Sequence, residues 1–226
     1  MKKVIGFCVL AALVWQSGCG LLGIVGVMGT PGSHERKITA EYDLASRRNE
    51  KVLVLVNQPL WLDAEVNLRY YLTEALNLYL TSKIKIKPER LVTYNQLAAF
   101  RSGESNFSLL SPVQVGKAMA ADIVLLAEVD GFELSELPEE GYYRGFLQTR
   151  AMLFDTASGA NLWPDFPEGK VIAAGFDMVS GGRQAGVNRL AGASAYGTVR
   201  FLYNCPKEKF RFADDRTGAQ WQNWEK

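Results

Sequence analysis

Two continuous aliphatic runs constrain the fold of this 226-residue chain more than any other feature. Residues 52–56 (VLVLV) and 123–127 (IVLLA) show no alternation of apolar and polar positions. This pattern is typical of strands that are buried on both faces of a sheet. Between them, apolar residues recur at helical spacing from residue 68 to residue 79. A strand, a crossover helix and a second strand pair in parallel, so we expect a parallel pair at the centre of the sheet.

The second half of the chain has the pattern of antiparallel strands. A long strand is predicted over 143–154, and residues 155–159 (DTASG) have the chemistry of a tight hairpin. Leu162 and Trp163 begin the return, and residues 170–178 complete the strand pair. We therefore predict an α/β fold of α+β character, with a mixed sheet of about five strands and helices packed on it. The sheet should be parallel in its first half and an antiparallel hairpin in its second.

Local signals predict the other elements. Asp63 is a suitable N-cap, Lys and Ile alternate over residues 83–87, and Ser111 and Gln114 form a capping box. The resulting elements are a helix that begins at Asp63, a half-exposed strand over 83–87, helices over 94–101 and 112–120, an acidic loop or edge excursion over 130–141 and a closing helix over 183–204.

The amino terminus has the order of regions found in a secretory signal peptide. Lys2 and Lys3 precede an apolar run over residues 4–15, which is too short to span a bilayer. Ser17, Gly18 and Cys19 then resemble the bacterial lipobox, although Gln16 stands where that family usually has Leu. The resemblance implies that Cys19 is lipidated, with acyl chains such as palmitate, and becomes the new amino terminus.

An uncleaved anchor is the alternative, because residues 4–28 could form one apolar helix. Four glycines in its second half, at positions 18, 20, 23 and 26, make it a poor one. Either anchor leaves the domain outside the cytoplasm and tied to a membrane. The expected organisation is a signal peptide over 1–18, a lipidated membrane-proximal linker over 19–50, a single domain over 51–205 and a partly ordered tail over 206–226.

Composition argues against several classes of function. The formal net charge of +1 gives no general attraction for nucleic acid. Cys205 is the only cysteine of the expected domain, so an intramolecular disulfide is excluded. The single histidine, His34, lies in the polar spacer, where it cannot complete a zinc site or a catalytic triad. We therefore expect no metal, no cofactor and no enzymatic activity.

Two blocks of sequence carry a resemblance to known envelope proteins. Residues 116–129 (GKAMAADIVLLAEV) and residues 146–163, with the DTASG turn and Leu162-Trp163, resemble blocks of the curli-secretion-channel and penicillin-binding-protein-activator lipoproteins. The amino-terminal domain of the Tol–Pal translocation protein is similar. The resemblance implies a non-enzymatic domain of the cell envelope that faces the periplasm and binds protein partners. Gly20 after the cysteine favours the outer membrane, by resemblance to enterobacterial sorting.

Candidate partner-binding residues lie on the predicted acidic loop and on the tail, because function concentrates on loops. They are Phe132, Glu133 and Glu136 in the loop, and Trp221 and Trp224 in the tail.

Two other classes of function stay open. One is a small-ligand-binding protein of the envelope, which needs a sizeable pocket. The other is an exported hydrolase that uses Asp63, Glu65, Asp122 or Glu128. Asp122 and Glu128 cannot act as a pair, because they lie at opposite ends of one strand, about 20 Å apart.

Overall fold

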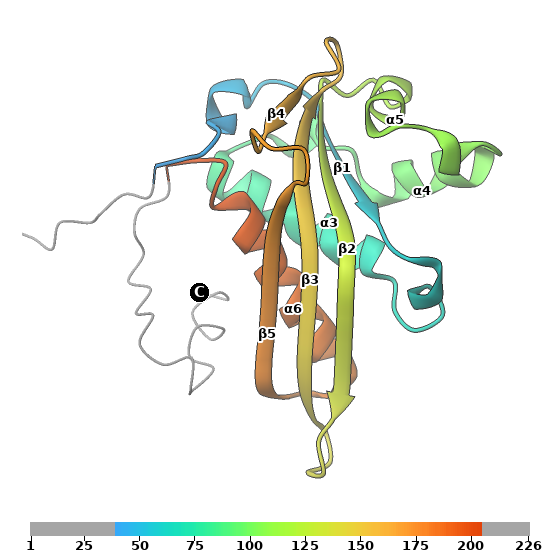
Figure 1. Cartoon of the computed structure of the whole chain (residues 1–226), viewed down its shortest axis with the longest axis vertical. Coiled ribbons are helices and arrows are strands. Elements are labelled where there is room, and N and C mark those ends of the chain that lie inside the picture. Colours follow the sequence, from blue (N-terminus) through green and yellow to red (C-terminus); the bar gives the residue numbers. More distant parts are fainter. Residues whose placement is uncertain (1–38, 205–226) are drawn as a thin grey trace, which may run out of the picture. The chain divides into compact units, whose positions relative to one another are not determined.

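A computed structural model describes residues 39–204, which form a mixed sheet with helices on both of its faces (Figure 1). The strands are β1 (Val52–Asn57), β2 (Ile123–Glu136), β3 (Tyr142–Asp155), β4 (Asn161–Trp163) and β5 (Lys170–Ser180). The α-helices are α3 (Leu68–Tyr79), α4 (Tyr94–Gly103), α5 (Pro112–Ala118) and α6 (Gly182–Val199). Short helical turns are η1 (Leu44–Arg47), η2 (Leu60–Leu62), η3 (Leu80–Ile84), η4 (Pro88–Arg90) and η5 (Phe107–Leu109). None of the helices within 39–204 has both the length and the hydrophobicity needed to cross a bilayer.

The strand pairing confirms the predicted mixed sheet. β1 pairs in parallel with β2, and Val54 lies opposite Leu125. β2 pairs antiparallel with β3, and both β4 and β5 pair antiparallel with β3 on its other side. The expectation that both strands of this pair lie at the centre is wrong for β1, which is the end strand of the order β1-β2-β3-β4. Its aliphatic side chains are nevertheless buried on both faces, because a hydrophobic core covers each side of it.

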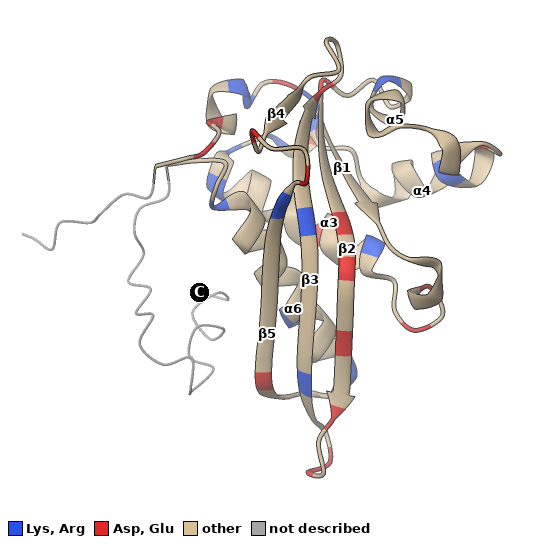
Figure 2. Cartoon of the chain, viewed as in Figure 1, with Lys and Arg blue, Asp and Glu red and all other residues tan. Residues whose placement is uncertain are grey.

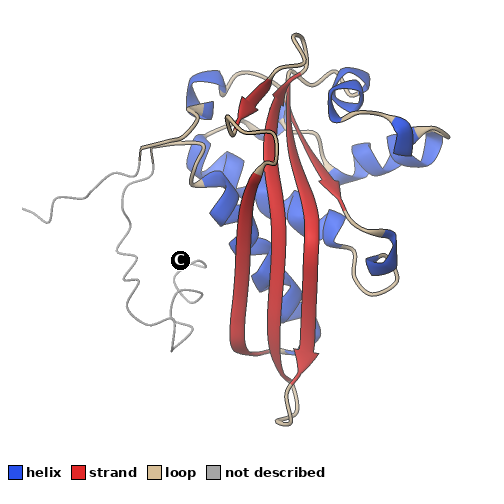
Figure 3. Cartoon of the chain, in the orientation of Figure 1, coloured by secondary structure: helices blue, strands red, loops and turns tan. Residues whose placement is uncertain are grey.

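The two faces of the sheet are covered unequally (Figure 3). On one face, α3 and α6 pack along the sheet and bury the larger core, which includes Leu125, Leu147 and Leu190. On the other face, α4 and α5 bury a smaller core that includes Leu53, Val124 and Leu126. This second core reaches only β1 and the neighbouring parts of β2 and β3. The rest of the sheet on that side carries exposed and half-exposed side chains.

Two sequence predictions differ from the structure: the start of the helix at Asp63 and the strand over residues 83–87. α3 begins at Leu68, where the Asn67 side chain accepts the Tyr70 N–H, while the Asp63 carboxylate pairs with Arg69. Residues 83–87 form no strand, because α3 continues into the π-helical turn η3 and Lys85 then adopts a left-handed conformation with φ of 69°. Ile84 and Ile86 are buried as an alternating pattern requires, but in the core rather than in a sheet.

The capping boxes of α4 and α5 are both formed. The Ser111 hydroxyl accepts the Gln114 N–H while the Gln114 side chain accepts the Ser111 N–H, as predicted, and Thr93 and Gln96 repeat the arrangement at α4. These reciprocal bonds satisfy amide groups that a helix otherwise leaves unpaired.

The ends of the described chain meet beside the carboxyl end of α6. Glu41 and Tyr42 donate backbone hydrogen bonds to the Phe201 carbonyl, and the Ala40 N–H donates to the Asn204 side chain. Leu44 is fully buried in the larger core. Residues 40–47, which the sequence analysis assigned to the linker, therefore pack on the domain.

Candidate partner-binding surface

The predicted site residues fall in different parts of the protein. Glu133 and Glu136 are exposed on β2. Phe132 is only 7% exposed and belongs to the larger core, so its ring is not available at the surface. Trp221, Trp224 and Cys19 lie outside the described residues.

A β-bulge explains the position of Phe132. The prediction of a loop over 130–141 is wrong, because β2 continues to Glu136 and only the turn to β3 is irregular. The β2–β3 register shifts between Val129 and Gly131. After Val129, the next side chain that faces the core is therefore Phe132, three residues later, instead of the residue at position 131. An extra residue of this kind reverses which side chains face the core.

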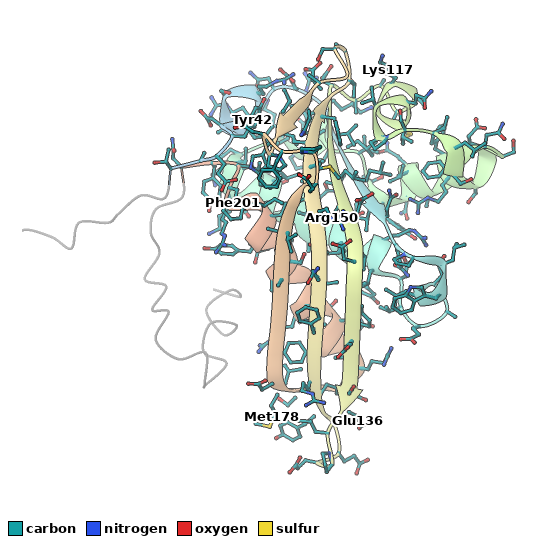
Figure 4. The ribbon with its side chains drawn as sticks, in the orientation of Figure 1. Tyr42, Lys117, Glu136, Arg150, Met178 and Phe201 are labelled. Carbon is teal, nitrogen blue, oxygen red and sulfur yellow. The ribbon has the colours of Figure 1, made fainter. Side chains whose placement is uncertain are left out.

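The uncovered side of β2, β3 and β5 forms what we call the outer sheet face. Helices α3 and α6 lie behind this part of the sheet, and α4 and α5 lie to one side of it (Figure 1). Arg150 projects midway along β3, whereas Glu136 and Met178 lie at the far end (Figure 4). The exposed and half-exposed outward residues are Glu128, Asp130, Glu133, Arg144, Phe146, Gln148, Arg150, Val171, Ala173, Asp177 and Met178.

Phe146 is the aromatic centre of the outer sheet face. In the register it stands between Glu133 on β2 and Gly175 on β5. A Cβ placed on Gly131 would lie 3.9 Å from the ring, and one on Gly175 would lie 3.7 Å from it. The ring thus covers the backbone of both neighbouring strands where they carry no side chain, and 39% of the residue remains exposed. A flat apolar platform results, and Ala173 and Val171 extend it along β5.

Charged residues flank this platform in two rows (Figure 2). The β2 row is acidic, and the β3 row contains Arg144 and Arg150. Arg150 donates to Asp130 through Nη2 at 2.8 Å and through Nε at 3.3 Å. Neither Glu128 nor Glu133 forms an ion pair within residues 39–204. Arg150 nevertheless stands opposite Glu128 in the register. The three carboxylates of the acidic row, Glu128, Asp130 and Glu133, outnumber the two arginines of the β3 row on this face by one.

Both borders of this surface are open strand edges. Among residues 39–204, β5 pairs only with β3, and β2 has a neighbour on its second side only as far as Glu128, opposite Asn57. Unpaired backbone groups at such edges can accept a strand from another chain.

A polar pocket lies at the carboxyl end of β1. Its volume is about 310 Å³, and its lining residues are Gln58, Asp63, Asn67, Arg69, Tyr94, Ala98, Arg101 and Ser102. Of the four carboxylates considered for hydrolysis, Asp63 alone lines it, and that carboxylate lies 2.6 Å from Arg69. Glu65 does not line the pocket, and its carboxylate instead pairs with Arg183 at 3.7 Å. Within residues 39–204 no three potential metal ligands cluster.

Leu60 and Trp61 form an exposed apolar tip that the sequence analysis did not identify. They belong to η2, between β1 and α3, and are 84% and 60% exposed. The available signal was the Pro-Leu-Trp-Leu sequence directly after a strand end, where no polar turn residue follows the proline.

This chain has limited similarity to known proteins. No family model matches the sequence, and no curated protein matches it. Among solved structures, the PelC dodecamer from Paraburkholderia phytofirmans is 14% identical, with a TM-score of 0.38, and the match covers 74% of this chain and 97% of that one. Lipoprotein GNA1162 from Neisseria meningitidis is 16% identical, with a TM-score of 0.39 and coverage of 57% and 83%. The LpoB C-terminal domain from Salmonella enterica is 19% identical, with a TM-score of 0.31 and coverage of 62% and 85%. Likeness of this degree assigns neither a family nor an activity.

Proposed function

We propose that this chain is a lipoprotein of the bacterial envelope, whose exported domain binds a protein partner on the outer sheet face and catalyses no reaction. The observation that carries the proposal is the Phe146 platform beside the acidic row of β2, in which Glu133 stands directly opposite Phe146. An aromatic side chain is costly to leave in water and is frequent at the centre of binding sites.

The charges on the surface define the chemistry of the partner. The partner should place an apolar group on Phe146 and basic side chains opposite the acidic row of β2. Complementary charge of this kind raises the association rate and fixes the orientation of the two proteins. The open edge of β5 adds backbone groups that can bind an extended segment of the same partner.

The tether limits how far the domain can reach from the membrane. Cys19 is separated from the described domain by residues 20–38, which span at most roughly 65 Å when fully extended. In this proposal the lipid on Cys19 holds the protein in the membrane, with the domain on the periplasmic side and the outer membrane as its site. Two or more acyl chains are needed for stable attachment, because one alone binds reversibly.

Site-specific photocrosslinking in living cells tests the binding surface. A benzoyl-phenylalanine at Ala173 on β5 should give a discrete crosslinked product, whereas the same group at the exposed Leu78 on α3 should not. Glu133→Lys should remove the product, and Glu89→Lys, a charge reversal at another exposed glutamate on η4, should leave it unchanged. Equal products at Ala173 and Leu78, or a product indifferent to Glu133→Lys, would contradict the proposal.

Substitution of Cys19 tests the anchor separately. Cys19→Ser should remove the acyl chains and leave the chain either soluble or as an uncleaved precursor. Mass spectrometry of the intact protein and radiolabelled palmitate would detect the change. If mass, labelling and membrane fraction were the same as for the unaltered protein, the uncleaved apolar helix over 4–28 would be the anchor instead.

A further inference from the structure

We propose that the polar pocket at the carboxyl end of β1 binds the oxyanion group of a small molecule, with Arg101 as its main contact. This inference does not depend on the partner-binding proposal, because the pocket and the outer sheet face share no residue. The pocket of about 310 Å³ has room for a small molecule, at the lower end of the usual size of ligand sites. It lies directly beyond the carboxyl end of β1, where Gln58 follows Asn57.

Arg101 is a half-buried cation without an anionic partner in residues 39–204. It comes from the last turn of α4, and its guanidinium lies 4.7 Å from the centre of the Phe107 ring. Its one hydrogen bond goes to the Val56 carbonyl, at 3.4 Å. A guanidinium carries five N–H donors, so most of its donors are unused.

The second arginine of the pocket is fixed and raises the positive potential. Arg69 donates to the Asp63 carboxylate at 2.6 Å and to the Gln58 carbonyl at 3.0 Å. Burial, followed by the repulsion of Arg69, lowers the pKa of Arg101 below its usual value. Two guanidinium groups face one carboxylate, so the lining has a net charge of +1 (2 − 1).

Among the neutral groups of the lining, the Tyr94 hydroxyl keeps a donor for a ligand, whereas the Ser102 hydroxyl donates to the Ala98 carbonyl and keeps only its acceptor capacity. The Gln58 side chain donates to the Val66 carbonyl and accepts from Arg69 N–H, so both of its ends are occupied. The Tyr94 hydroxyl accepts from Asn67 at 2.9 Å, and its own hydrogen has no acceptor among the described residues. Arg101 and Tyr94 therefore offer hydrogen bonds to a group that only accepts them.

These features define the class of ligand. A carboxylate matches the planar fork of a guanidinium and accepts two parallel hydrogen bonds from it. A single negative charge neutralises the net charge of the lining, whereas the Asp63 carboxylate disfavours a second. A monoanionic carboxylate should therefore bind more tightly than a phosphate dianion of similar size.

Calorimetric titration of the full chain in detergent micelles tests the proposal. The probes are N-acetylglycine, its uncharged amide and inorganic phosphate, at an ionic strength matched with sodium chloride. N-acetylglycine should bind with saturation and the amide should not. Tighter binding of phosphate would identify the oxyanion as a phosphate group. Absence of binding by both anions, or equal binding of the amide, would overturn the proposal.

Matched variants locate the binding in this pocket. Arg101→Gln should weaken N-acetylglycine binding at least tenfold, and Arg101→Lys, which keeps the charge but not the fork, should weaken it several-fold. Tyr94→Phe retains the ring, which packs edge-on against Tyr70, and should also weaken binding several-fold. Arg90→Gln on η4, an exposed arginine outside the pocket, is the control and should have no effect.

Folding of each variant is checked by its melting temperature. If Arg101→Gln fails to fold, Arg101→Lys and Tyr94→Phe still decide the question. Unchanged affinity in folded Arg101→Lys and Tyr94→Phe would show that the anion binds elsewhere and would overturn the proposal.

Discussion

The hydroxyl oxygens of Thr149 on β3 and Ser194 on α6 lie 2.8 Å apart, and both residues are buried in the domain. Removing one partner of a buried hydrogen bond leaves the other unsatisfied, at a cost of about 1–3 kcal/mol, whereas removing both costs less than the sum. We expect Thr149→Val and Ser194→Ala each to lower the free energy of unfolding by about that amount. Urea unfolding of the two single variants and the double variant measures it.

The double variant provides the control for this prediction. It should be more stable than additivity predicts, by about 1 kcal/mol, because the unpaired hydroxyl is absent. Strict additivity would mean that the two hydroxyls are not coupled in solution.

The Asp155 carboxylate makes stability depend on pH. It accepts the Ser158 N–H at 2.8 Å and pairs with Arg47 at 2.7 Å. The Ser158 N–H, followed by the Arg47 guanidinium, lowers the pKa of Asp155 to about 2. A lowered pKa stabilises the folded state above the ordinary value near 4, and this contribution is lost as the pH falls towards about 2.

Asp155→Asn should therefore be destabilised at neutral pH, and its deficit should shrink between about pH 4 and pH 2. Thermal unfolding across this range measures the difference. Asp165→Asn, at an exposed position, should match the unaltered protein at every pH. A deficit of Asp155→Asn that stayed constant down to pH 2 would mean that the effect is not electrostatic.

Gly116 marks a close approach of α5 to the sheet. A Cβ at this position would lie 2.5 Å from both the Thr156 and Val124 side chains. Gly116→Ala should therefore destabilise the domain by about 1–3 kcal/mol, the usual range for overpacking. Denaturant unfolding compares it with Gly103→Ala, where a Cβ meets nothing within 4 Å. Equal stability of the two variants would show that α5 can move away from the sheet at little cost.

Substitution of Leu125 tests whether β2 is buried inside the sheet. This residue is fully buried in β2 opposite Val54, so Leu125→Ala should cost about 2–5 kcal/mol. That is a large part of a typical stability of about 5–15 kcal/mol. Leu78→Ala removes the same atoms from an exposed position on α3 and should change the melting temperature little. Similar shifts for the two variants would be incompatible with Leu125 lying at the centre of the sheet.

Local sequence was sufficient to predict the parallel pairing of β1 with β2, the hairpin after β3 and the cap of α5, but not the position of β1 at the edge of the sheet. Each depends on neighbouring residues: an unbroken aliphatic run needs burial on both faces, and Ser111 with Gln114 closes its own hydrogen bonds. The inward position of Phe132 could not be predicted in this way, because a bulge inserts one residue into the alternation.

Both candidate sites arise from long-range packing. Phe146 becomes a platform because the register places Gly131 and Gly175 under its ring, and Arg101 meets Arg69 because α4 packs beside the start of α3. Periodicity reports the face on which a side chain lies. It does not report which distant residue lies beside that side chain, since strand register and helix packing set that neighbour.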